Sequence, residues 1–84
     1  MTQTSRGTAG IDTAKAKLDV AIQGPTGGQT TAFTVENRAE GWRRLAAALA
    51  EAGVERVGIE ATGGYERGVV EHLRGAGGSV RIFV

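Results

Sequence analysis

The chain has 84 residues, which is enough for one small domain with a modest core. Its formal net charge of +1 neither requires nor excludes nucleic acid, because a basic face can be hidden in a neutral total. Cysteine is absent, which excludes disulfides and thiolate metal sites. The polar N-terminus lacks the apolar core of a signal peptide, and no apolar run approaches the roughly 18 residues of a membrane span. We therefore expect a cytoplasmic protein that does not enter a membrane.

Three short strands are predicted in the first half of the chain. Residues 1–7 are expected to be a flexible tail, and an apolar segment interrupted by Asp12 runs from about Gly7 to Ala14. Alternating apolar residues predict a half-buried strand over residues 18–23. A turn over residues 24–28 leads into a Thr-rich third strand over residues 29–35. The two short connections favour an antiparallel meander, with the third strand at an edge.

A helix is predicted next. Asn37 is a good helix N-cap, and Glu40 is placed to reach back as in a capping box. Trp42 falls on the same face as Leu45, so we expect it in the core, and Gly53 is a natural C-terminal stop.

The remaining elements are a strand, a helix and a strand. The fourth strand covers residues 54–59, and the second helix runs from about residue 64 or 65 to residue 74, with Tyr65 and Ala76 among its inward residues. Its residues Arg67, Glu71 and Arg74 are expected to form a salt-bridged exposed face, with His72 beside them facing solvent. A fifth strand covers residues 79–84.

The order of elements is strand, strand, strand, helix, strand, helix, strand. A meander that continues into two right-handed crossovers matches the α/β, ribonuclease H-like arrangement, a mixed five-stranded sheet of order 3-2-1-4-5 in which only the second strand is antiparallel. No repeat or linker divides the chain into domains. The chain ends on a strand, so we expect a truncated fold, with the 84 residues the front piece of a longer protein.

Asp12 and Glu60 are the candidate catalytic and metal-binding residues. In the predicted sheet they lie on adjacent strands, about 4.8 Å apart, and can point to the same face. Two close carboxylates without His or Cys suit Mg²⁺ or Mn²⁺, and a pair of such ions supports phosphodiester chemistry. The alternative is structural: Asp12 caps a turn and Glu60 caps the second helix. The spacing alone leaves both readings open.

Three other polar residues lie near Asp12 in the sequence. Lys15 and Lys17 flank the hairpin and are candidates for nucleic-acid phosphate contacts, although a solvated hairpin is the simpler reading. Asp19 alternates away from Leu18 and Val20, and we interpret it as a solvent-facing strand residue rather than a metal ligand.

Three segments carry a family resemblance: residues 10–21, Asn37 with Gly41, and residues 60–66. They closely resemble the N-terminal part of the DEDD transposases of the insertion sequence 110 family, to which the Piv-type DNA invertases are related. The resemblance spans residues 8–84 and implies the front part of a RuvC-like catalytic domain. Family members continue into a second domain with a serine nucleophile. Their four acids, Asp, Glu, Asp and Asp, bind divalent cations, and by matching position the first two are Asp12 and Glu60.

The resemblance implies DNA transposition or site-specific recombination. Its implied partners are DNA and a structured non-coding bridge RNA, which would make recombination RNA-guided. The other two acids and the serine are absent from these residues, so we expect no catalysis by this chain alone. We also expect a homo-oligomer, because strands at the sheet edges can pair.

Two alternatives belong to other classes. Sugar kinases and actin-like ATPases share the opening strand, Asp and hairpin, but residues 14–17 replace their small-residue phosphate loop, which disfavours ATP. A non-catalytic nucleic-acid-binding or self-association module is the second alternative.

Overall fold

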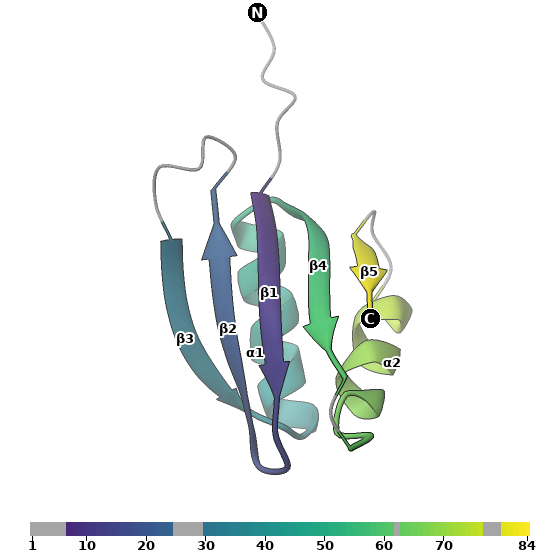
Figure 1. Cartoon of the computed structure of the whole chain (residues 1–84). Coiled ribbons are helices and arrows are strands. Elements are labelled where there is room, and N and C mark those ends of the chain that lie inside the picture. The colour runs from purple at the N-terminus through teal and green to yellow at the C-terminus, as the bar shows by residue number, and fades with distance from the viewer. Residues whose placement is uncertain (1–6, 25–29, 62, 77–79) are drawn as a thin grey trace, which may run out of the picture.

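The computed structural model describes residues 7–24, 30–61, 63–76 and 80–84. Residues 1–6 of the expected tail and most of the 24–28 turn lie outside these ranges, and Gly7 already belongs to the first strand. Within the described ranges the elements follow the predicted order (Figure 1): β1 (Gly7–Thr13), β2 (Lys17–Gln23), β3 (Thr30–Glu36), α1 (Ala39–Glu51), β4 (Val54–Glu60), α2 (Arg67–Gly75) and β5 (Arg81–Phe83).

The strands form one mixed sheet in the order β3-β2-β1-β4-β5. Strand β2 is antiparallel to both β1 and β3, whereas β4 is parallel to β1 and to β5. The predicted ribonuclease H-like topology is therefore confirmed, and β3 and β5 are the outer strands of the sheet.

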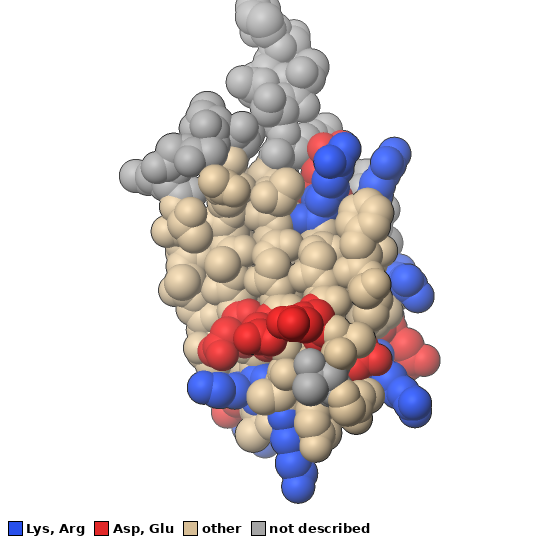
Figure 2. Space-filling model, in the orientation of Figure 1, with Lys and Arg blue, Asp and Glu red and all other residues tan. Residues whose placement is uncertain are grey.

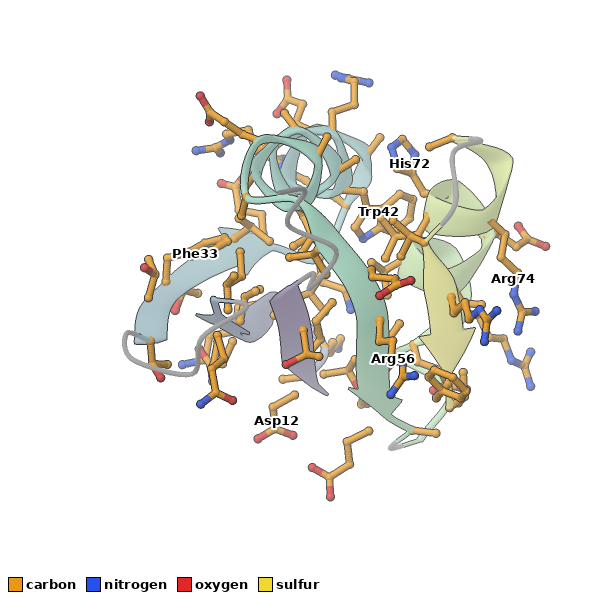
Figure 3. The ribbon with its side chains drawn as sticks, turned by 90° about the horizontal axis from the view of Figure 1, so that it is seen from above. Asp12, Phe33, Trp42, Arg56, His72 and Arg74 are labelled. Carbon is orange, nitrogen blue, oxygen red and sulfur yellow. The ribbon has the colours of Figure 1, made fainter. Side chains whose placement is uncertain are left out.

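Both helices cover the same face of the sheet (Figures 1 and 3). Strands β1 and β2 alternate strictly, so that every second side chain of these strands enters the core beneath the helices. Leu18, Leu45 and Val57 are completely buried there. Trp42 is half-buried and packs against this core, as the sequence predicts. No helix in the described ranges is long and apolar enough to cross a membrane.

The other face of the sheet carries no helix in the described part of the chain, and we call it the open face (Figure 1). It is formed by the alternate, exposed strand residues Thr8, Gly10, Asp12, Lys17, Asp19, Ala21, Gln23, Thr30, Ala32, Thr34, Glu36, Arg56, Gly58, Glu60, Arg81 and Phe83.

Helix α1 begins one residue later than an Asn37 cap would require. Its N-cap is Arg38, which makes no side-chain capping bond, and Glu40 pairs with Arg38 at 3.3 Å instead of completing a capping box. The N-cap prediction for Asn37 was wrong because its side chain is engaged elsewhere, as described below. Gly41 permits the close approach of α1 to β3, since a Cβ there would lie 1.8 Å from the Glu36 carbonyl oxygen.

Helix α2 also begins later than predicted, at Arg67. Gly63 and Gly64 adopt positive φ angles of 61° and 83°, so the chain turns before it becomes helical. Tyr65 is left in that turn, 42% exposed, with its ring against Gly63. The prediction that Tyr65 faces inward was wrong for this reason, and Ala76 is exposed as well.

The outer side of α2 differs from the prediction in two details. Arg67, Glu71 and Arg74 are exposed, but no ion pair joins them within the described residues. His72 is half-buried, with its ring centroid 6.1 Å from that of Trp42, so it does not simply face solvent (Figure 3). Gly68 makes room for this packing, because a Cβ there would lie 2.2 Å from the Trp42 ring.

We predict that Gly41→Ala destabilises the chain by about 3 kcal/mol or more, because the added methyl group meets backbone that cannot move without shifting β3. The matched control is Gly75→Ala in α2, where a Cβ meets nothing within 4 Å. That control should be neutral or stabilising by up to about 1 kcal/mol through helix propensity. Urea unfolding followed by circular dichroism measures both, and equal stabilities of the two variants would contradict the close approach.

Candidate active site

Asp12 and Glu60 lie side by side on the open face. They are register partners on the parallel strands β1 and β4, and each is the outward residue at the carboxyl end of its strand. A hydrogen bond of 2.8 Å from the Thr13 hydroxyl to the Glu60 carbonyl ties the two strand ends together. Thr13 is itself buried. The strand spacing of about 4.8 Å therefore separates the two backbones that carry the acids.

Asp19 continues this pair across the sheet. It is the register partner of Asp12 on β2, and its carboxylate accepts a hydrogen bond of 2.8 Å from the Thr34 hydroxyl of β3. The acidic band in Figure 2 crosses the middle of the open face. Asp19 is exposed, as predicted, but the sequence reading did not place it beside Asp12. In an antiparallel hairpin with its turn at residues 15 and 16, Asp12 and Asp19 are equally far from the turn, so the sequence alone could have paired them.

The carboxylates of Asp12 and Glu60 are both exposed and make no hydrogen bond or ion pair with any residue in the described ranges. The structural alternative does not fit this arrangement. Helix α2 has Glu66, not Glu60, at its N-cap position, and no side-chain capping bond is made there. Both carboxylates are consequently available to a ligand in front of the sheet.

The carboxylate oxygens of Asp12 and Glu60 are the kind of ligand that a hard divalent cation prefers, but two carboxylates are too few for a complete site. Two carboxylate oxygens with an open outer side match the way Mg²⁺ is bound, through one or two carboxylates together with water and substrate phosphates. No group of three or more Asp, Glu, His or Cys side chains in the described ranges is arranged to hold a metal ion. Asp12 and Glu60 thus fit part of a metal site rather than a closed one.

Lys15 and Lys17 lie at the same end of the sheet as the acids. Lys15 is exposed in the turn between β1 and β2, and Lys17 is exposed on the open face beyond Asp19. Glu36 is the register partner of Lys17, but its carboxylate pairs with Arg38 at 3.2 Å. Lys17 makes no ion pair with any described residue, so its ammonium group remains available to an anion.

Asn37 holds together the loops behind the acidic site. Its amide nitrogen donates to the carbonyl oxygens of Ala14, at 2.8 Å, and of Tyr65, at 3.0 Å. Its amide oxygen accepts a hydrogen bond of 2.9 Å from Trp42 Nε1. One side chain therefore connects the turn that follows Asp12, the loop that follows Glu60, and helix α1. The sequence reading missed this role because it assigned the same polar side chain to a local cap.

Glu66 is a second residue of this loop that the sequence reading did not single out. Its Oε1 atom is buried and has no hydrogen-bond partner within the described residues. It borders a small hollow that it shares with Val70 and Val84.

We predict that Asn37→Ala lowers the free energy of unfolding by about 2–4 kcal/mol, because three hydrogen bonds of about 1 kcal/mol each are lost and Trp42 Nε1 is left without its acceptor. The neighbouring control is Arg38→Ala, which removes only exposed ion pairs and should cost less than about 1 kcal/mol. Denaturant unfolding measures both values. A loss for Asn37→Ala no larger than that of the control would show that the three bonds do not stabilise the loops.

Comparison with protein families gives a match over almost the whole chain. The family model of the DEDD transposases of insertion sequence 110, described as a transposase, matches residues 9–84. No curated protein gives a significant match. The match begins within β1, extends past β5 and includes both acids of the candidate site. This chain belongs to the DEDD transposase family of insertion sequence 110, a family whose members act on DNA.

Proposed function

We propose that this chain forms the front part of a RuvC-like catalytic domain, in which Asp12 and Glu60 are half of the acidic site that binds Mg²⁺ or Mn²⁺. The observation that supports this most strongly is their parallel register. Asp12 pairs with Glu60, and both carboxylates lie exposed on the open face without a described partner. The transposase family match over residues 9–84 supports this proposal, since transposition requires phosphodiester chemistry.

The role of the two acids in this proposal is to bind and orient. Divalent ions held by such a site would supply the positive charge that activates an attacking oxygen and stabilises a leaving oxygen of a phosphodiester. Asp12 and Glu60 contribute oxygen ligands from fixed positions, since sheet pairing and the bond from Thr13 to the Glu60 carbonyl hold their backbones. A rigid sheet edge keeps the ligands oriented without further reorganisation.

Two ligands are too few for a complete two-metal site, so we propose that the 84 residues alone do not cleave DNA. Completion requires the further acids and the serine that the family resemblance implies. The same resemblance supports a structured bridge RNA as a second nucleic-acid partner. The outer strands β3 and β5 support self-association through strand pairing.

The alternative function is a non-catalytic binding module. Metal binding at Asp12 and Glu60 distinguishes the proposed catalytic domain from this alternative. We predict that Mn²⁺ added to the ¹⁵N-labelled chain broadens the amide resonances around Asp12 and Glu60 first. Asp12→Asn and Glu60→Gln should each weaken this binding about tenfold or more, because one of two charged ligands is lost. Nuclear magnetic resonance titration measures the effect.

The control for this titration is Glu51→Gln, which neutralises an exposed acid at the end of α1, away from the open face. It should leave the broadening near Asp12 unchanged. The metal site would be contradicted if the Asp12 and Glu60 variants did not reduce the broadening, or if Glu51→Gln reduced it equally. Either result would favour the binding module.

We also predict that the purified 84-residue chain does not nick supercoiled DNA in the presence of Mg²⁺ or Mn²⁺, because half of the family's acids are missing. Conversion of supercoiled to relaxed plasmid on an agarose gel measures this. Metal-dependent nicking that disappears in Asp12→Ala would show that these residues suffice for catalysis.

A further inference from the structure

Two arginines lie next to each other on the open face, away from the acids. Arg56 of β4 and Arg81 of β5 are register partners on parallel strands, and both are exposed. Arg56 is displayed on the same side of the sheet as Asp12, opposite the helices (Figure 3). In Figure 2 a group of Lys and Arg side chains accordingly stands above the acidic band, over the end of the sheet where β4 and β5 pair.

These arginines differ from those near α1 in their partners. Arg38 and Arg44 both reach the Glu36 carboxylate, at 3.2 and 3.5 Å. Arg56 and Arg81 form no ion pair or side-chain hydrogen bond with any residue in the described ranges. Like charges directly opposite each other on paired strands are destabilising. An anion in front of the sheet would remove that repulsion, and planar guanidinium groups suit the two-pronged binding of phosphate.

The row between the arginines and the acids is made of small residues on β1 to β4, and it ends at Phe83, the exposed register partner of Gly58 on β5. Gly10 and Gly58 are register partners in the middle of the sheet, and a Cβ on either would meet nothing within 4 Å. Ala21 and Ala32 continue the same row across β2 and β3. The hollow in front of this row also includes Asp12 and Glu60. On β1 to β4, therefore, no side chain of this row keeps a broad ligand away from the sheet, and the Phe83 ring borders the hollow on the β5 side.

The spacing of charges along the sheet matches a polyanion better than a single ion. Glu60 follows Arg56 by four residues along β4, which corresponds to about 13 Å of extended strand. Duplex DNA carries one phosphate per about 3.4 Å of axis on each strand, so both sites fall within the length of about four nucleotides. Lys17 stands on the far side of the acidic row and supplies a cation there too.

We propose that the open face is a docking surface for the phosphate backbone of DNA, with Arg56 and Arg81 as a phosphate clamp that positions the strand over the acidic row. The proposal rests on the proposed function, because it takes Asp12 and Glu60 as the point where the phosphodiester reacts. The DNA backbone crosses the floor of small residues from the clamp to the acids. Lys17 contacts it beyond the acids.

The test is a fluorescence anisotropy titration of the full 84-residue chain with a labelled 20-base-pair DNA duplex. At 50 mM salt, Arg56→Ala/Arg81→Ala should weaken binding about tenfold or more. The slope of log K against log salt should become shallower by about 1.8, since two phosphate contacts contribute about 0.9 each. Between 50 and 200 mM salt, wild type should therefore lose about 12-fold more affinity than this variant.

The matched control is Arg43→Ala/Arg74→Ala, which removes two exposed arginines from the helices. Both double variants change the formal net charge from +1 to −1, so a difference between them reports position and not total charge. The control should change affinity less than about twofold. Arg56→Lys/Arg81→Lys keeps both charges and should retain most of the salt slope. This variant also tests the clamp if circular dichroism shows that the alanine variant does not fold.

Several results would overturn the clamp. They are the absence of salt-dependent binding by wild type, equal losses in the two alanine variants, or a tenfold preference for an RNA duplex of the same sequence. A wild-type dimer in sedimentation velocity that the Arg56/Arg81 variant makes monomeric would assign the face to a second copy instead.

The Mn²⁺ titration separates this proposal from the one on which it rests. Metal binding at Asp12 and Glu60 should persist in Arg56→Ala/Arg81→Ala. If DNA binding fails while Mn²⁺ binding holds, the clamp alone is lost. If Mn²⁺ binding fails while the arginine effect holds, the metal site alone is lost and the DNA surface stands.

Discussion

The parallel pairing of β1 with β4 is the constraint on which the site depends. Side chains alternate with a period of two along a strand, so a shift of one residue would send either acid into the core. The pairing register is fixed by the inward residues, among them Ile11 and Ile59, and by the hydrogen bond from Thr13 to the Glu60 carbonyl. Burial of an apolar row on one face therefore determines which polar residues meet on the other.

Asn37 extends this constraint from the sheet to the loops. The acids lie where β1 and β4 end, and Asn37 contacts the segments that follow both strands. A single amide group binds both segments and accepts a hydrogen bond from Trp42, which in turn packs against His72 and Gly68. Three elements distant in the sequence thus converge behind the acidic row, and the open face remains free for a ligand.

The sequence predicts the sheet well because alternation and short connections are local signals. Strand order, the core positions and the pairing of Asp12 with Glu60 all follow from them. Asn37 was misplaced because its side chain makes tertiary hydrogen bonds, which a local capping pattern does not reveal. Tyr65 was misplaced because Gly63 and Gly64 adopt positive φ angles, which a helical period of apolar residues does not reveal. Arg56 and Arg81 became neighbours only once β4 and β5 were in register, and β5 follows a crossover whose length does not fix that register.

The most direct test of a shared metal site at Asp12 and Glu60 is a crystal structure of the chain soaked with Mn²⁺, with the metal located by its anomalous scattering. A shared site predicts an anomalous peak on the open face within about 2.3 Å of carboxylate oxygens of both Asp12 and Glu60. A peak bound by other acids, or an experimental sheet in which these two carboxylates point to opposite faces, would contradict it.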